Sequence, residues 1–223
     1  FSAPFGRDGI ITAFETLWVN PTLARGVVSF LAGAQGTAED PDPGAHPGKI
    51  LHEMRTGEMA SLGEIPFDRY YGSHDATPLF VMLAAAYHDR TDDVAFIQKI
   101  WPSLEAALQW IERFGDVDND RFVEYARQSP TGLVQQGWKD SFDSIFHANG
   151  ELAPAPIAAC EIQAYVYAAY RAGSILASAL GKPERSAEYA VKATALFELF
   201  DKHFWDESLG TYVLALDGNK RPC

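Results

Sequence analysis

The order of helices and loops along the chain constrains its fold more than any other feature. Two stretches, residues 76–114 and 159–204, each show a helix, a tight turn and a second helix in the recurrence of apolar side chains. The turns fall at 88–93 and 181–184, whereas the connection between the pairs, 115–158, is long. Tight turns at one end and long loops at the other predict an all-α fold, an α/α toroid with the long loops on its active face. A helical repeat array is the alternative, although such arrays have shorter, regular periods.

A closed toroid of six helix pairs needs more chain than this sequence provides. About 12 helices of roughly 12–15 residues, with their loops, require about 250–300 residues, and this chain has 223. We expect the N-terminal half to two-thirds of such a toroid, with residues 1–223 forming part of a single α/α-barrel domain. The start at Phe1 without an initiator methionine, and the end at Cys223, also indicate a piece of a longer protein. We expect the rest of the barrel, or a second copy, to cover the exposed apolar flank.

The two ends of the chain carry further elements. A helical pattern over residues 10–31 contains Pro21, which predicts a kink or a split. Residues 33–48 are rich in glycine, proline and aspartate and predict a loop. The pattern over residues 205–216 predicts a short hairpin around residues 207–210.

Charge and composition exclude several classes of partner. The chain has 18 basic and 30 acidic side chains, a formal net charge of −12. Such a field repels phosphate backbones and anionic lipids, so nucleic acid and membrane surfaces are not expected partners, whereas a neutral sugar is compatible with it. The most apolar run, residues 79–87, is much shorter than the roughly 20 residues of a membrane span. Two cysteines and no secretory leader pattern favour a cytoplasmic location.

The segment that carries the strongest chemical signal is Gln135-Gln136-Gly137-Trp138-Lys139-Asp140-Ser141-Phe142-Asp143, in the long loop between the pairs. Trp138 offers a flat apolar face on which a pyranose ring can stack. Asp140 beside that face is a candidate general acid, because desolvation raises the pKa of a carboxyl group. If the segment is extended, Trp138 and Asp140 share a face and Lys139 points away. The alternative is a helix start with Asp140 or Ser141 as its N-cap.

Three further clusters are candidate sugar-binding sites. Glu53, Arg55 and Glu58 lie in residues 49–58 and can hold hydroxyl groups through charged hydrogen bonds, or can form a solvated surface network instead. Residues 70–75 place two tyrosines and Asp75 ahead of a helix, where Asp75 can also serve as an ordinary N-cap. The third cluster, at the start of the first helix, is Gly6-Arg7-Asp8, in which Arg7 and Asp8 can also simply pair with each other.

Metal sites are less well supported. Asp116, Asp118 and Asp120 resemble the start of a calcium loop, but Arg121 stands in place of its glycine and Arg127 in place of its bidentate glutamate. Glu124 could be a ligand in a different loop geometry. We prefer a polar turn without metal, and the six histidines show no metal-ligand spacing. No cofactor is expected.

Several segments together resemble the catalytic domain of glycogen-debranching-type glucosidases, the amylo-alpha-1,6-glucosidase-like proteins related to glycoside hydrolase families 63 and 15. The segments that carry the resemblance are residues 4–8, 48–55, 70–80, 118–127, 136–141 and 160–167. The resemblance implies an (α/α)6 barrel and inverting hydrolysis of α-glucosidic linkages in an oligo- or polysaccharide. Asp140 matches the aspartate that serves as general acid in such enzymes. Their base is a later glutamate that has no good match before Cys223, so we expect this chain alone to be an incomplete catalyst.

The remaining roles follow from this assignment. Glu161 lies in a segment to which the resemblance assigns substrate contact or loop support. The expected substrate-binding residues are Arg7, Asp8, Glu53, Arg55, Tyr71, Asp75, Trp138, Lys139 and Glu161. Two other functions stay open: a sugar epimerase or isomerase using His52 and His74, and a carbohydrate-binding module without chemistry. Product mass distinguishes the first, and an unchanged function in Asp140→Asn would indicate the second.

Overall fold

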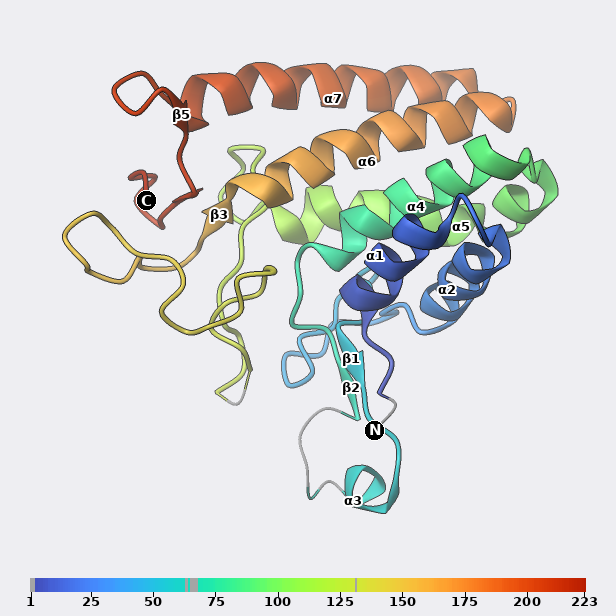
Figure 1. Cartoon of the computed structure of the whole chain (residues 1–223), viewed down its shortest axis with the longest axis horizontal. Coiled ribbons are helices and arrows are strands. Elements are labelled where there is room, and N and C mark those ends of the chain that lie inside the picture. Colours follow the sequence, from blue (N-terminus) through green and yellow to red (C-terminus); the bar gives the residue numbers. More distant parts are fainter. Residues whose placement is uncertain (1–2, 63, 65–67, 131) are drawn as a thin grey trace.

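A computed structural model describes residues 3–62, 64, 68–130 and 132–223. The described residues form seven α-helices, and the six longer ones make three pairs, α1 with α2, α4 with α5 and α6 with α7. Figure 1 shows the turns of the last two pairs at one end of the molecule and the long loops at the other. The helical class and the placement of the long loops are therefore as the sequence predicted. Among the described residues, no helix is both long and apolar enough to cross a bilayer.

The first helix pair is divided at proline. Helix α1 spans Gly6–Thr16 and α2 spans Pro21–Gly33, with Pro21 at the first position of α2. Proline is tolerated there because the first turn of a helix leaves its N–H groups without intrahelical partners. The predicted split at Pro21 is confirmed.

The second pair turns within two residues. Helix α4 spans Ala76–Thr91 and α5 spans Val94–Trp110, continued by a single π-helical turn, η1, over Ile111–Gly115. The carboxylate of Asp93 accepts a hydrogen bond from the amide of Phe96 at 3.1 Å, which caps α5. The cap and the left-handed Asp92 explain why the chain reverses so tightly.

The third pair is the longest. Helix α6 spans Cys160–Ala179 and α7 spans Pro183–Phe204. Gly181 between them has a φ of 68°, which glycine adopts without steric cost. The sequence pattern predicts these helices over residues 159–180 and from 183 to about 204, so both observed helices lie within one residue of the predicted bounds.

Short strands tie the loops to the helices. The antiparallel pairs are β1 (Glu53–Met54) with β2 (Arg69–Tyr70), β3 (Ala158–Ala159) with β6 (Ala215–Leu216), and β4 (Trp205–Asp206) with β5 (Thr211–Tyr212). The third pair is the predicted hairpin, whereas the sequence did not predict the other two. A four-residue helix, α3 (Glu58–Ser61), follows β1.

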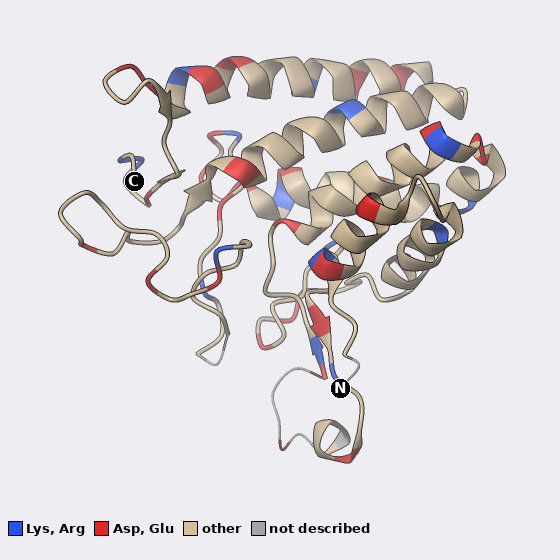
Figure 2. Cartoon of the chain, in the orientation of Figure 1, with Lys and Arg blue, Asp and Glu red and all other residues tan. Residues whose placement is uncertain are grey.

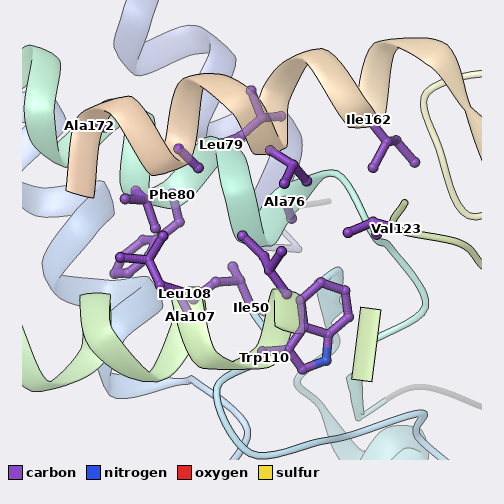
Figure 3. Packing of buried hydrophobic residues seen from close by; sticks show 14 of the residues in the cluster. Ile50, Ala76, Leu79, Phe80, Ala107, Leu108, Trp110, Val123, Ile162 and Ala172 are labelled. Atoms are coloured by element: carbon purple, nitrogen blue, oxygen red, sulfur yellow. The ribbon is translucent and has the colours of Figure 1, made fainter. Parts of the chain in front are cut away.

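The core lies between α4, α5 and α6. Figure 3 shows Phe80, Leu108, Trp110 and Ile162 converging there with Ile50, which precedes β1. Ile50, Phe80, Leu108 and Trp110 are fully buried. Because Ile50 is part of this core, the loop that leads to β1 is fixed to the helices at their loop end.

Candidate functional site

An ion pair joins the start of α1 to the residue before α4. The guanidinium Nη1 of Arg7 lies 2.8 Å from Oδ2 of Asp75, whose side chain is 0% exposed. Ser73 donates to the other carboxylate oxygen at 2.9 Å. Asp75 occupies the predicted N-cap position of α4, but its carboxylate forms no capping hydrogen bond with the helix. The carboxylate instead pairs with Arg7, and the Ala76 amide bonds to the Ser73 hydroxyl.

Backbone contacts at Gly6 direct Arg7 toward Asp75. The amide of Gly6 donates to the carbonyl of His52 at 2.8 Å, and that of Met54 donates to Pro4 at 3.0 Å. A Cβ at position 6 would lie 2.0 Å from the carbonyl oxygen of Leu51. Glycine is therefore required where α1 begins beside β1.

Charged residues from two segments surround His52. Glu53 is 6% exposed and pairs with Arg55 two residues later. Burial lowers the pKa of His52, and the charge of Arg7 adds to this effect, whereas the charges of Asp75, Glu53 and Asp8 oppose it. Glu53, the pair Arg7 and Asp8, and Asp75, which come from the three predicted clusters, therefore lie together around His52. Because Glu53 is buried, Glu53, Arg55 and Glu58 do not form a purely solvated surface network, although Glu58 and Asp8 are exposed.

Helix α6 contributes a second carboxylate. Glu161, in its first turn, is partly buried, and burial together with the charge of Asp75 raises its pKa, while Lys139 opposes the rise. A Cβ on Gly137 would lie 3.4 Å from Oε1 of Glu161. The segment that carries Asp140 therefore lies against Glu161. Figure 2 shows acidic residues at the starts of α1 and α6 and on β1, all at the loop end.

Tyr165 is a residue that sequence reasoning missed. It lies one helical turn after Glu161, and its pKa is raised by burial and by the charges of Glu161 and Asp75, against that of Arg7. Its hydroxyl group is therefore a further candidate sugar contact. The four-residue spacing from Glu161 is the signal that could have revealed it.

The segment with the candidate acid is an irregular loop. The Nζ of Lys139 lies 5.2 Å from the ring centroid of Trp138, so the expectation that Lys139 points away is wrong. The cause is that the chain bends at residues 137, 138 and 141, so its side chains do not alternate as they would in an extended strand. These bends also exclude a helix starting at Asp140 or Ser141. Trp138 is 54% exposed and Asp140 is exposed, so the expected apolar wall does not desolvate Asp140.

Buried glutamines anchor this loop. Tyr125 donates to Oε1 of Gln135 at 2.6 Å. The side-chain amide of Gln136 donates to the carbonyls of Ala126 and Leu133, both at 3.3 Å. The backbone carbonyl of Gln136 accepts from the amide of His74 at 2.9 Å. The loop is thus tied directly to the residue before Asp75.

Three other predicted residues are buried. Tyr71 is 5% exposed, and its hydroxyl donates to the carbonyl of Ala34 at 2.8 Å, so its ring packs in the core and does not offer a stacking face. His52 and His74 are 9% and 4% exposed. Burial, followed by the charge of Lys49, holds the pKa of His74 well below its usual range. An epimerase based on these histidines has no support in this geometry.

The turn that carries Asp116, Asp118 and Asp120, here called the aspartate turn, contains the ammonium group of Lys220. Oxygens of Asp116, Asp118 and Asp120 all lie within 4.8 Å of one another. The Nζ of Lys220 lies 2.9 Å from Asp118 and 2.7 Å from Asp120, and it also contacts Glu124. A cation is thus present in the turn as part of the chain.

A separate apolar cavity lies between α1 and α2. Its volume is about 750 Å³, and its lining includes Phe5, Leu23, Val27 and Phe30. Sugar sites need several polar groups that converge on the ligand, and this lining provides few. We therefore place the candidate sugar site at Arg7, Asp75 and Glu161.

Comparisons with known proteins gave a partial structural match and a family match. A solved structure described as a sialidase is 19% identical, with a TM-score of 0.47, and the match covers 62% of this chain and 12% of that chain. This chain therefore spans a small part of that structure. No curated protein matches the chain. The family model described as the mannosylglycerate hydrolase MGH1-like glycoside hydrolase domain matches residues 7–222. The match extends over nearly the whole chain, which therefore belongs to the MGH1-like glycoside hydrolase domain family.

Proposed function

We propose that the protein containing this chain hydrolyses α-glycosidic linkages with inversion, with α-glucosides as the main substrate class. The observation that carries the proposal is the convergence of Arg7, Asp75, Glu161 and the Asp140 segment at the loop end of a glycoside hydrolase domain. Charged groups held by partners make strong hydrogen bonds to hydroxyl groups. The site therefore suits a polyhydroxylated ligand.

Asp140 is the proposed general acid. It donates its proton to the leaving oxygen while the sugar covers the exposed face of Trp138 and excludes water from the carboxyl group. The proposed contacts to hydroxyl groups come from Arg7, Asp8, Glu53, Arg55, Lys139 and Glu161. Buried Asp75 orients Arg7. Inversion also needs a carboxylate base roughly 6.5–9.5 Å from the acid, and we assign none among the described residues.

The proposed architecture is an (α/α)6 barrel to which these helix pairs contribute, and the proposed location is the cytoplasm. The family description names mannosylglycerate hydrolase, so a mannoside of an organic acid is a second substrate candidate. Arg7, Arg55 and Lys139 are cationic and could accept such a carboxylate. The two substrate classes are therefore tested together.

The experiment uses the full-length gene product. Maltose, isomaltose, a branched α-glucan and mannosylglycerate are incubated with enzyme, and proton NMR follows the anomer that first appears. Hydrolysis with inversion releases the β-anomer from an α-linkage. Asp140→Asn should lower kcat by about 10²–10⁴-fold, whereas Asp143→Asn, an exposed aspartate in the same loop, should retain wild-type activity.

Each other result contradicts part of the proposal. Release of the α-anomer excludes inversion. Wild-type turnover by Asp140→Asn removes that residue as the acid, and binding without turnover by the wild-type protein indicates a carbohydrate-binding module. A product with the mass of the substrate indicates an isomerase.

A further inference from the structure

The ammonium group of Lys220 forms ion pairs with the carboxylates of Asp118, Asp120 and Glu124. An ammonium group has three N–H donors, so each donor has one carboxylate partner. These partners lie about a hundred residues earlier in the chain, with Glu124 separated from Lys220 by 96 positions. The contact therefore joins the C-terminal segment to the loop after α5.

The turn around this ammonium has the backbone of a cation-binding loop. Asn119 and Arg121 have φ values of 65° and 78°, the left-handed region that side chains rarely adopt. The carboxylate of Asp116 accepts from the amides of Asp120 and Arg121 at 3.0 and 2.9 Å, which holds that shape. Arg121 thus takes the conformation of the glycine that it replaces in a calcium loop.

Lys220 is itself held in a strained conformation. Its φ is 60°, and its amide donates to the carbonyl of Asp217 at 2.8 Å. The buried carboxylate of Asp217 accepts from the amides of Asn219 and Arg221 at 2.8 and 2.9 Å. Strained residues persist where the surrounding structure holds them in place. Here the turn at Asp217 places the ammonium group of Lys220 against the carboxylates of the aspartate turn.

Glu124 adds a buried carboxylate to this cluster. Its side chain is 0% exposed, and its Oε2 has no hydrogen-bond partner among the described residues. Burial raises its pKa, as do the charges of Asp118 and Asp120, while Lys220 opposes the rise. Without Lys220, this carboxyl group would face two aspartates with no compensating charge. A buried oxygen with a free lone pair is also a suitable metal ligand.

We propose that Lys220 is the built-in cation of this turn: its ammonium takes the place of a divalent metal ion, and its removal creates a calcium site at Asp118, Asp120 and Glu124. Carboxylate oxygens in a flexible loop suit Ca²⁺ better than Mg²⁺, which demands a near-ideal octahedron.

The inference extends to the candidate active site, and this part rests on the proposed function. Tyr125 follows Glu124 directly and donates to Gln135, five residues before Asp140. An anchor of the segment that carries the candidate acid therefore lies one residue from a partner of Lys220.

The test compares Lys220→Ala with the wild-type protein by calorimetric titration of Ca²⁺ and by thermal denaturation in EDTA or in about 1–10 mM CaCl₂. The wild type should bind no Ca²⁺ at this turn and show no change in Tm. Lys220→Ala should have a lower Tm in EDTA, bind one Ca²⁺ and regain several degrees of Tm in calcium. Asp118→Asn combined with Lys220→Ala should lose that calcium response.

Lys192→Ala is the matched control, because Lys192 bridges two carboxylates, of Glu112 and Glu188, outside this turn. It should gain no calcium response, and Lys220→Arg should behave as the wild type. If Lys220→Ala is insoluble, its recovery on refolding in CaCl₂, but not in MgCl₂, is the equivalent result. Calcium binding by the wild type that is abolished by Asp118→Asn would overturn the proposal. A Lys220→Ala protein whose Tm does not change in calcium and that binds no Ca²⁺ would also overturn it. These measurements do not depend on enzymatic activity, so their failure is distinguishable from failure of the proposed hydrolysis.

Discussion

Arg7 and Asp75 are 68 positions apart in the sequence, yet their side chains form a buried ion pair with a distance of 2.8 Å. The pair joins the first turn of α1 to the residue before α4. Since Asp75 also accepts from Ser73, its carboxylate is held on both oxygens. The position of Arg7 in the candidate sugar site therefore depends on a residue that solvent does not reach.

Replacing Arg7 should destabilise the protein strongly. Arg7→Met leaves Asp75 buried without its cation, which should cost about 3–5 kcal/mol of the free energy of unfolding. Urea denaturation measures this loss. Arg185→Met is the control, because Arg185 pairs with Glu188 at the surface and should contribute less than about 1 kcal/mol. Equal losses in the two variants would show that burial does not strengthen the Arg7 pair.

Tyr125 should control the order of the loop that carries Asp140. Tyr125→Phe leaves the buried Oε1 of Gln135 without the donor 2.6 Å away, at a cost of about 1–3 kcal/mol. We also expect a lower kcat, because the loop loses an anchor near the candidate acid. Tyr212→Phe removes an exposed hydroxyl bonded to Asp201 and should change stability by about 0.5 kcal/mol or less. Wild-type stability and kcat in Tyr125→Phe would contradict the anchoring role.

Lys49 should make stability depend on pH. Burial lowers its pKa to about 7, and its Nζ donates to the carbonyl of Gly44 at 3.2 Å. In the unfolded chain the group regains its ordinary pKa of about 10.4, so the unfolded state binds more protons between about pH 7 and pH 10. Stability should therefore rise with pH across this window, by up to about 1.4 kcal/mol per unit from this group.

Lys49→Met should flatten that slope. Urea denaturation of both proteins at several pH values from about 7 to 10 provides the measurement. Lys202→Met removes an exposed lysine from α7 and controls for the change in net charge. A slope that Lys49→Met leaves unchanged would mean that Lys49 is not the titrating group.

Alanine substitutions at two glycines of the first helix pair should change the stability of the protein in opposite directions. At Gly6 the added Cβ would lie 2.0 Å from the Leu51 carbonyl oxygen, so Gly6→Ala must displace α1 from β1 and should cost about 1–3 kcal/mol. Gly26 lies within α2, and no atom of the described residues outside the neighbouring backbone lies within 4 Å of an added Cβ. Gly26→Ala should stabilise the protein by about 0.5–1 kcal/mol. Thermal denaturation of both variants tests whether each substitution lowers or raises stability. A Gly6→Ala protein as stable as the wild type would exclude the close contact between Gly6 and the Leu51 carbonyl.

Local signals in the sequence were sufficient for the later helices, whereas α1 begins at Gly6, four residues before the predicted start, and α3 was not predicted. The apolar periodicity of α4 through α7, Pro21 at the first position of α2 and Gly181 after α6 act within a few residues, so these bounds could be predicted. The strands β1 with β2 and β3 with β6 were missed because each is two residues long and shows no alternation. Pairing of such short strands is decided by the packing of the elements that flank them.

The sequence by itself determined the helical class and the position of the long loops, and it supplied the candidate residues for a sugar site, because periodicity and motif spacing are read along the chain. The tertiary structure decided which of those residues meet. Arg7 reaches Asp75 and Lys220 reaches the aspartate turn across intervals without local constraint. The Tyr71 side chain is buried in the core, and the ammonium group of Lys139 lies over the ring of Trp138. The physical reason is that burial and ion pairing depend on three-dimensional distance, which packing of the helices sets and local sequence does not encode.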